Sequence, residues 1–134
     1  MALSDVAGYK ETTTIELYEP GTLAILKNDD GSPMTVTVAG PHSEIYKKEV
    51  NRQKNLYLAM ARKSGGRINQ TAEKMDAEGE RLLIACVTEW NITTDDGKPQ
   101  PECTPENIAD VFRRFTFIKS QIDDAFGDES RFLG

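Results

Sequence analysis

Three short segments near the N-terminus have the residue pattern of β-strands. Residues 34–39 alternate apolar and threonine side chains, which is typical of a half-buried strand. Residues 12–18 are rich in β-branched side chains, and residues 22–27 form a second such run after a turn at Pro20-Gly21. The cluster Asn-Asp-Asp-Gly-Ser-Pro at 28–33 favours a tight turn. The pattern therefore predicts three strands, with 22–27 and 34–39 joined as a β-hairpin.

From Gly40-Pro41 onward the apolar period changes from two to that of a helix. A first helix is predicted from there to Gly65-Gly66, with a thin apolar stripe of Tyr46, Val50, Tyr57, Met60 and Ala61. A second helix is predicted from about 69–71 to Trp90. Its stripe is the best in the chain and contains Ala72, Met75, Gly79, Leu82, Leu83, Cys86, Val87 and Trp90. Glycine is a poor helix former, so Gly79 on this stripe suggests that another backbone approaches there.

A turn-rich crossing over 91–103 leads to the clearest helix start in the chain. Thr104 offers a capping hydroxyl, Pro105 suits the first helical position, and Glu106 complements the positive end of the helix. The third helix carries Ile108, Val111, Phe112 and Phe115 at helical spacing. Thr116 is expected to cap a fourth helix, which ends at Gly127 and turns inward Ile118, Ile122, Ala125 and Phe126.

These elements predict an α+β fold that is mainly α. An N-terminal β-hairpin unit or small antiparallel sheet (residues 1–40) precedes a domain of three to four helices (residues 41–134), and the two together form one compact domain. Six side chains are expected to form the core that shapes any groove: Leu82, Val87, Trp90, Phe112, Phe115 and Phe126.

Charge and cysteine content narrow the class of protein. The chain has 134 residues and a formal net charge of −6, which argues against a primary nucleic-acid binder. Cys86 lies on an apolar helix face, where a small buried hydrophobe is expected, and a disulfide with Cys103 has no support. No apolar run approaches the roughly 20 residues of a membrane span. A cytoplasmic protein is therefore expected.

The first predicted helix and its exit carry the main positive cluster in this acidic chain. Its members are Lys47, Lys48, Arg52, Lys54, Arg62, Lys63 and Arg67. The cluster is either a solvated helix face, the usual meaning of such a run, or a docking surface for an acidic partner or for RNA. RNA is the weaker option because no stacking aromatic motif accompanies the basic residues.

Groups that could support catalysis are sparse. His42 is the one histidine and lies at an expected helix start, where a surface or capping role is the usual one. One histidine and two distant cysteines are too few soft ligands for zinc, and Asp123 and Asp124 are adjacent and so diverge around a helix. Asp29-Asp30-Gly31 lacks the downstream ligands of a calcium loop, and Ser64-Gly65-Gly66-Arg67 lacks the lysine of a phosphate loop. The sequence predicts no enzyme, no metal and no cofactor. A binding or assembly protein remains, and its helices either bury one another or leave a groove for a partner helix.

The C-terminal two fifths of the chain resemble a known family. The residues that carry the resemblance are Glu80–Leu83, Thr88-Glu89-Trp90-Asn91, Asp96-Gly97-Lys98-Pro99, Thr104-Pro105-Glu106-Asn107 and Phe115–Ile118. This arrangement is similar to the tail assembly chaperones of long-tailed bacteriophages and prophages, in which a helix ending in Trp-Asn is followed by a turn, a cap and a short helix pair. Thr116 stands where that pattern would have a proline.

The resemblance implies a non-enzymatic role in the host cytoplasm. Such chaperones bind the tape measure protein, assist the tail tube protein in polymerising around it, and are absent from the finished virion. The residues expected to contact partners are Lys47, Lys48, Arg52, Arg62, Lys63, Arg67, Trp90, Phe115 and Phe117. A homo-oligomer is also compatible with the pattern. Two alternatives stay open: a structural tail or head–tail joining protein that pairs through hairpin edges, and a nucleic-acid-linked regulator that uses the basic helix at 47–67.

Overall fold

A small antiparallel sheet and four α-helices form the part of the chain that the structure describes. The computed structural model describes residues 1–5, 8–66 and 71–133. The elements in chain order are η1 (Leu3–Asp5), β1 (Thr12–Glu16), β2 (Thr35–Ala39), α1 (Glu44–Lys63), α2 (Ala72–Cys86), β3 (Val87–Asn91), α3 (Pro105–Arg114), α4 (Thr116–Phe126) and η2 (Glu129–Phe132). The predicted α+β class, mainly α, is confirmed.

The sheet has three strands in the order β1-β2-β3, all antiparallel. Ile15 faces Val36 in the β1–β2 register, and Val36 faces Trp90 in the β2–β3 register. Threonines line the opposite side of the same ladder, where the hydroxyls of Thr14 and Thr37 lie 2.9 Å apart. The sheet therefore has one face on the core and one polar face, as antiparallel sheets commonly do.

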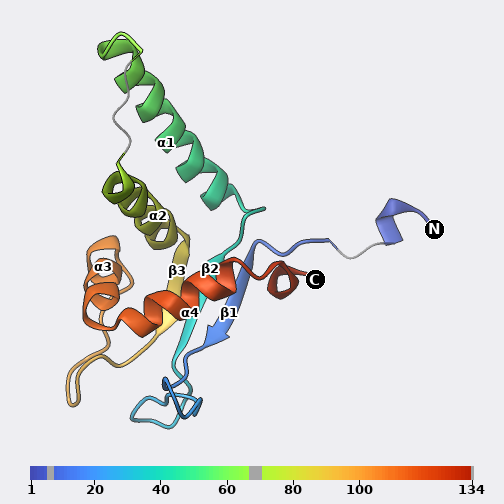
Figure 1. Ribbon diagram of the computed structural model, residues 1–134. Coiled ribbons are helices and arrows are strands. Elements are labelled where there is room, and N and C mark those ends of the chain that lie inside the picture. The colour runs from blue at the N-terminus through green and yellow to red at the C-terminus, as the bar shows by residue number, and fades with distance from the viewer. Residues whose placement is uncertain (6–7, 67–70, 134) are drawn as a thin grey trace.

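Helix α4 crosses the core side of the sheet, and α3 lies beside it (Figure 1). The buried cluster takes side chains from β1, β2, α2, β3, α3 and α4, with Leu17, Val36, Val38, Ile92, Ile108, Phe112 and Ile122 among its most enclosed members. One core thus joins the N-terminal strands to the C-terminal helices.

Of the six side chains expected to form the core, Val87 and Phe112 are buried. The other four are partly buried and pack against the cluster: Leu82, Trp90, Phe115 and Phe126.

The predicted strand at 22–27 is wrong, and so is its hairpin with 34–39. Both edges of β2 are occupied, by β1 and β3, so residues 22–27 cannot pair with β2 as a further strand. Residues 22–27 instead make isolated bridges, Tyr18 to Ile25 and Lys27 to Pro33. The turn cluster is confirmed, since Gly31 has a φ of +84°.

The second helix ends at Cys86, and the prediction that it continues to Trp90 is wrong. Residues 87–91 form β3, because Val-Thr-Glu-Trp-Asn has high strand propensity and the free edge of β2 accepts it. The part of the predicted start at 69–70 lies outside the described residues. Thr71 caps the helix by accepting a hydrogen bond from the Lys74 amide.

The prediction that another backbone approaches Gly79 is also wrong. A Cβ at this position would have no atom within 4 Å. Gly79 lies on the exposed part of α2, beyond the body of the protein.

The cap at Thr104 is confirmed, because its hydroxyl accepts a hydrogen bond from the Asn107 amide at 3.2 Å. The predicted Thr116 cap is wrong: Thr116 is the first residue of α4, Phe115 holds the cap position, and no side chain caps this end. Only Phe115 separates α3 from α4, so there is no room for a capping turn between them.

Candidate protein-binding surface

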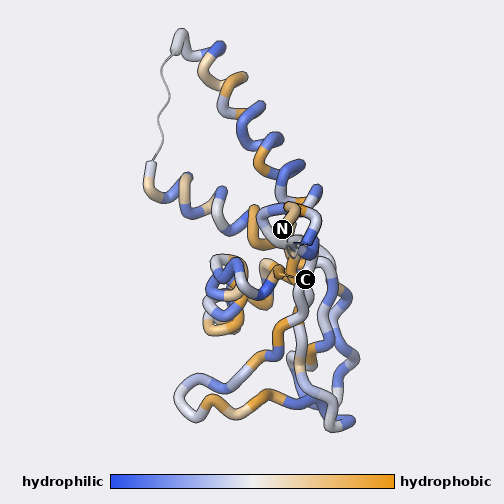
Figure 2. Tube along the Cα trace, turned by 90° about the vertical axis from the view of Figure 1, so that its right-hand side faces the viewer, coloured by the Kyte–Doolittle hydropathy of each residue, from blue (hydrophilic) through white to orange (hydrophobic). Residues whose placement is uncertain are grey.

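Helices α1 and α2 form an antiparallel hairpin that projects from the body (Figure 1). None of the α1 side chains is buried, and on α2 only Leu83 and Cys86 are, close to the sheet. Figure 2 shows apolar positions along the projecting part of α1 as well as in the body. We call the exposed part of this pair, residues 54–63 and 72–79, the hairpin arm.

The base of α1 is fixed by a buried cap and by aromatic packing. The Ser43 hydroxyl accepts a hydrogen bond from the Tyr46 amide at 3.1 Å and donates one to the Gly40 carbonyl at 2.6 Å. The Tyr46 ring packs 5.6 Å from that of Phe126 on α4. A Cβ on Gly40 would lie 2.5 Å from the Phe132 ring, so only glycine fits between this turn and the C-terminal segment. These contacts set the direction in which α1 leaves the sheet.

The two helices are tied together midway by one glutamine. Gln53 donates to the Glu78 carbonyl at 3.1 Å and to the Glu49 carboxylate at 3.2 Å. Glu49 also accepts from the Arg52 guanidinium, which lowers the pKa of the Glu49 carboxyl. Beyond this tie the side chains of both helices become exposed.

Large apolar side chains are exposed on the hairpin arm. On α1 they form a nearly continuous run, Leu56, Tyr57, Leu58 and Met60. On α2, Met75 is 59% exposed. A cluster of exposed large apolar residues, as opposed to scattered single ones, is typical of a protein–protein contact surface.

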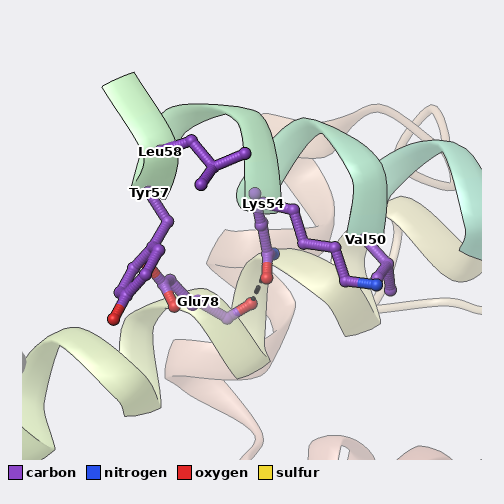
Figure 3. Close-up of a pocket in the computed structure, with 6 residues that line it drawn as sticks. Val50, Lys54, Tyr57, Leu58 and Glu78 are labelled. Atoms are coloured by element: carbon purple, nitrogen blue, oxygen red, sulfur yellow. Dashed lines mark hydrogen bonds between the residues drawn. The ribbon is translucent and has the colours of Figure 1, made fainter. Parts of the chain in front are cut away.

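Two shallow grooves flank α1. The first, of about 420 Å³, lies between α1 and α2 and is lined by Val50, Gln53, Lys54, Tyr57, Leu58 and Glu78. In Figure 3, Tyr57 extends from α1 toward α2 near Glu78, whereas Leu58 lies along α1. The second, of about 540 Å³, lies between α1 and the start of β3 and is lined by Ile45, Lys48, Glu49, Arg52, Ala85, Val87 and Thr88.

The charge of α1 is opposite to that of the whole protein. This helix has six basic and two acidic residues, whereas the chain has a net charge of −6. Lys47 lies 3.9 Å from Glu44 and Arg52 is paired with Glu49. Lys48, Lys54, Arg62 and Lys63 form no ion pair with the residues that the structure describes. The arm therefore combines apolar side chains with unneutralised positive charge.

The predicted contact residues separate into two groups. Lys47, Lys48, Arg52, Arg62 and Lys63 all lie exposed on α1, and Arg67 lies outside the described residues. The three aromatic residues lie elsewhere, on β3 and around the α3–α4 junction, and each is half-buried: Trp90, Phe115 and Phe117.

The aromatic group supports the fold. The Trp90 indole donates to the Pro101 carbonyl at 2.8 Å and so fixes the crossing before α3. The rings of Phe115 and Phe117 meet edge to face at 6.4 Å, and the Arg114 guanidinium lies 5.0 Å from the Phe115 centroid. These residues pack against the core and do not extend the surface of the hairpin arm.

The exposed apolar residues of the arm were not predicted as contacts. Tyr57, Met60 and Met75 were assigned to inward stripes, and Leu56 and Leu58 to none. A signal was present, because the consecutive residues Leu56, Tyr57 and Leu58 diverge by about 100° each around a helix and cannot share one face.

Few groups in the described structure are placed for chemistry. Within residues 1–5, 8–66 and 71–133, no three histidine, cysteine or acidic side chains converge as a metal site would require. His42 is exposed and stacks on Tyr9 with ring centroids 3.8 Å apart. Both cysteines are free thiols, and burial raises the pKa of the Cys86 thiol to about 11, so it stays protonated at neutral pH.

Comparison with known proteins does not assign the chain to a family. No family model, no curated protein and no solved structure matches it. Among the described residues, no helix has the length and apolar character needed to cross a membrane. What the fold and the surface define is an α+β protein with a projecting, partly apolar and basic helical hairpin.

The segment that carries the resemblance to tail assembly chaperones folds only partly as that pattern would have it. Trp90-Asn91 lies on β3 and does not end a helix. The turn that follows is present, with Gly97 at a φ of +73° and the Lys98 amide bonded to the Asp95 carbonyl. The cap at Thr104-Pro105 and the short helix pair α3–α4 are present as well.

Proposed function

We propose that this protein is a non-enzymatic assembly protein of the tail assembly chaperone type, and that it holds its client through the hairpin arm. The client of such a chaperone is the tape measure protein, and the assembly it assists is that of the tail tube. The role belongs to the host cytoplasm, and the protein leaves before the virion is complete.

One observation carries the proposal: four large apolar side chains stand exposed on the α1 part of the hairpin arm, beside cations that have no ion-pair partner among the described residues. Exposing such residues costs solubility, so a surface of this kind is retained where a partner covers it. A long, largely helical, aggregation-prone chain would bury its own apolar residues against the arm, while the net charge of −6 keeps the complex in solution.

The resemblance of residues 80–118 to tail assembly chaperones supports tail assembly as the process in which the protein acts. It lies mostly in the body, in β3, the crossing and the α3–α4 pair, whereas the arm supplies the contact surface. In this proposal the body holds the arm in position, and the arm contacts the client.

The test is co-expression with a tape measure protein. The expected result is that the tape measure protein stays soluble and co-purifies, and that Leu58→Ser or Lys54→Glu in the arm reduces both effects. Leu23→Ser and Lys27→Glu are the matched controls, because they change exposed residues of the same types outside the arm. A tape measure protein that is equally insoluble with and without this chain would refute the proposal.

The alternatives predict different results in purified particles and in binding assays. A structural tail or head–tail joining protein would be present in purified virions, where mass spectrometry would detect it, whereas a chaperone would be absent. A nucleic-acid-linked regulator would bind RNA or DNA with an affinity that falls steeply with salt and with charge reversal on α1.

A further inference from the structure

The hairpin arm leaves two apolar tracts uncovered, one on each helix. The α1 tract is the run Leu56, Tyr57, Leu58 and Met60. The α2 tract is Ala72, Met75 and Gly79, which continues the helix stripe whose other end, Leu83 and Cys86, is buried in the body. The two tracts belong to one antiparallel helix pair, so an occupant that covers both must itself be about two helices wide.

The charges of the two helices differ in sign along the same stretch. Residues 50–63 of α1 contain four basic and no acidic side chains, and residues 72–80 of α2 contain four acidic and one basic. A partner helix of uniform charge would be attracted to one helix of the arm and repelled by the other. A partner that complements both must carry a basic and an acidic helix side by side, as a second copy of the arm does.

A two-fold axis parallel to the arm satisfies this requirement. It places each α1 antiparallel to the α2 of the other copy, so that every neighbour in the resulting four-helix bundle runs in the opposite direction and carries the opposite charge. Those exposed apolar side chains of the arm that face the axis are then covered in the centre of the bundle.

The size of the contact sets its strength. Ten residues of helix are about 15 Å long and two packed helices about 20 Å wide, so the face covers roughly 300 Å². This is small beside the roughly 800 Å² per partner that a standard interface buries. A contact of this size fits a weak, reversible dimer and not a permanent one.

We infer that the hairpin arm is a self-association surface, and that the free protein is a two-fold dimer in which basic α1 of each copy pairs with acidic α2 of the other. The inference does not depend on the tail function. If both hold, dimerisation covers the arm until a client displaces the second copy, and the purified protein alone is enough to test the dimer.

The test is sedimentation equilibrium of two charge-reversal variants. The α1 reversal carries Lys54→Glu and Arg62→Glu, and the α2 reversal carries Glu73→Lys and Asp76→Lys. None of these four residues has an ion pair with another described residue, and circular dichroism checks that each variant keeps its helices. The matched control, Lys10→Glu with Lys27→Glu, changes the net charge as the α1 reversal does but lies outside the arm.

The expected result is a wild-type dimer whose dissociation constant rises about tenfold or more in each reversal variant and is unchanged in the control. An equimolar mixture of the two reversal variants should dimerise again, because each reversed helix then faces its opposite charge. The inference is overturned if the wild type is monomeric up to about 500 µM, if the reversal variants dimerise as the wild type does, or if their mixture stays monomeric. An assembly larger than a dimer would overturn the two-fold geometry.

Discussion

Two glycine-to-alanine substitutions should change the stability of this protein in opposite directions. Gly40 lies between β2 and α1, and a Cβ there would be 2.5 Å and 2.6 Å from two carbon atoms of the Phe132 ring. Gly79 lies within α2, and a Cβ there would meet nothing within 4 Å. Neither residue has a positive φ, so an alanine backbone fits both positions and only the surroundings differ.

The expected loss of unfolding free energy in Gly40→Ala depends on how tightly the Phe132 ring is packed. Its side chain is 1% exposed, so the ring cannot move away without losing buried contacts. Forcing an extra methyl group into a packed site costs about 1–3 kcal/mol, and loss of the whole Phe burial would cost about as much. The lower entropy of the unfolded alanine chain returns about 0.5 kcal/mol. We expect Gly40→Ala to lower the free energy of unfolding by about 2 kcal/mol.

Gly79→Ala should raise the free energy of unfolding by about 1 kcal/mol, because alanine is the better helix former and meets no obstacle. The assay is urea unfolding followed by circular dichroism and by the fluorescence of Trp90, the one tryptophan of the chain. The reasoning is refuted if Gly40→Ala is as stable as the wild type.

A double-mutant cycle identifies the cause. Phe132→Ala alone should cost about 3–5 kcal/mol, and clearly less in the Gly40→Ala background, where the ring is already displaced. Strictly additive costs would mean that the contact between Gly40 and Phe132 is not what limits residue 40.

Three further predictions concern buried polar groups. Ser43→Ala removes the buried cap of α1 and should cost about 1–2 kcal/mol of unfolding free energy in the same assay. Asn28→Ala should cost about 2–3 kcal/mol, because it removes the hydrogen bonds that join the buried Asn28 amide to Asn91, Thr93 and Gln100, whereas Asn55→Ala on exposed α1 should have little effect. Cys103 should react with a thiol reagent in the native protein, and buried Cys86 only on unfolding. Because burial raises the pKa of the Cys86 thiol from 9.0 to about 11, the free energy of unfolding should fall as the pH rises from 9 toward 11, and it should fall less in Cys86→Ala.

The elements that sequence reasoning predicted correctly are those that local chemistry decides. Helix α3 begins where Thr104 and Pro105 predict, because the capping hydroxyl and the amide that donates to it are only three residues apart. Gly31 and the end of α1 at Gly65-Gly66 are of the same kind, since a positive φ selects glycine whatever the rest of the fold does.

Strand β3 could not be predicted in this way. Leu83, Val87 and Trp90 have the spacing of a helix stripe, and the run from 87 to 91 fits a strand equally well. The choice is made by the free edge of β2, about fifty residues away in sequence. The same distant pairing occupies an edge of β2, the strand with which residues 22–27 were expected to pair, so both errors occur together.

The candidate site was predicted only in its charged part. The basic residues of α1 were found because a charge cluster is visible in the sequence. The apolar residues of the arm were hidden, because the α2 stripe runs unbroken from Ala72 to Cys86 and nothing in its period marks where the body of the protein stops covering it. Which part of a stripe is exposed depends on the size of the body, a property of the whole fold.

The division between body and arm also limits what the resemblance to tail assembly chaperones can say. The residues that carry it, from Glu80 to Ile118, hold the crossing and the α3–α4 pair in place: Trp90 bonds to Pro101, and Thr104 caps α3. Such residues are constrained by folding, so two proteins can share them and bind different clients with their arms. Under the proposed function, the choice of client is therefore a property of the hairpin arm, and exchanging the arm between two proteins that share this body should exchange the client while the body stays folded. This is why the binding and self-association experiments change residues of the arm and leave the body intact.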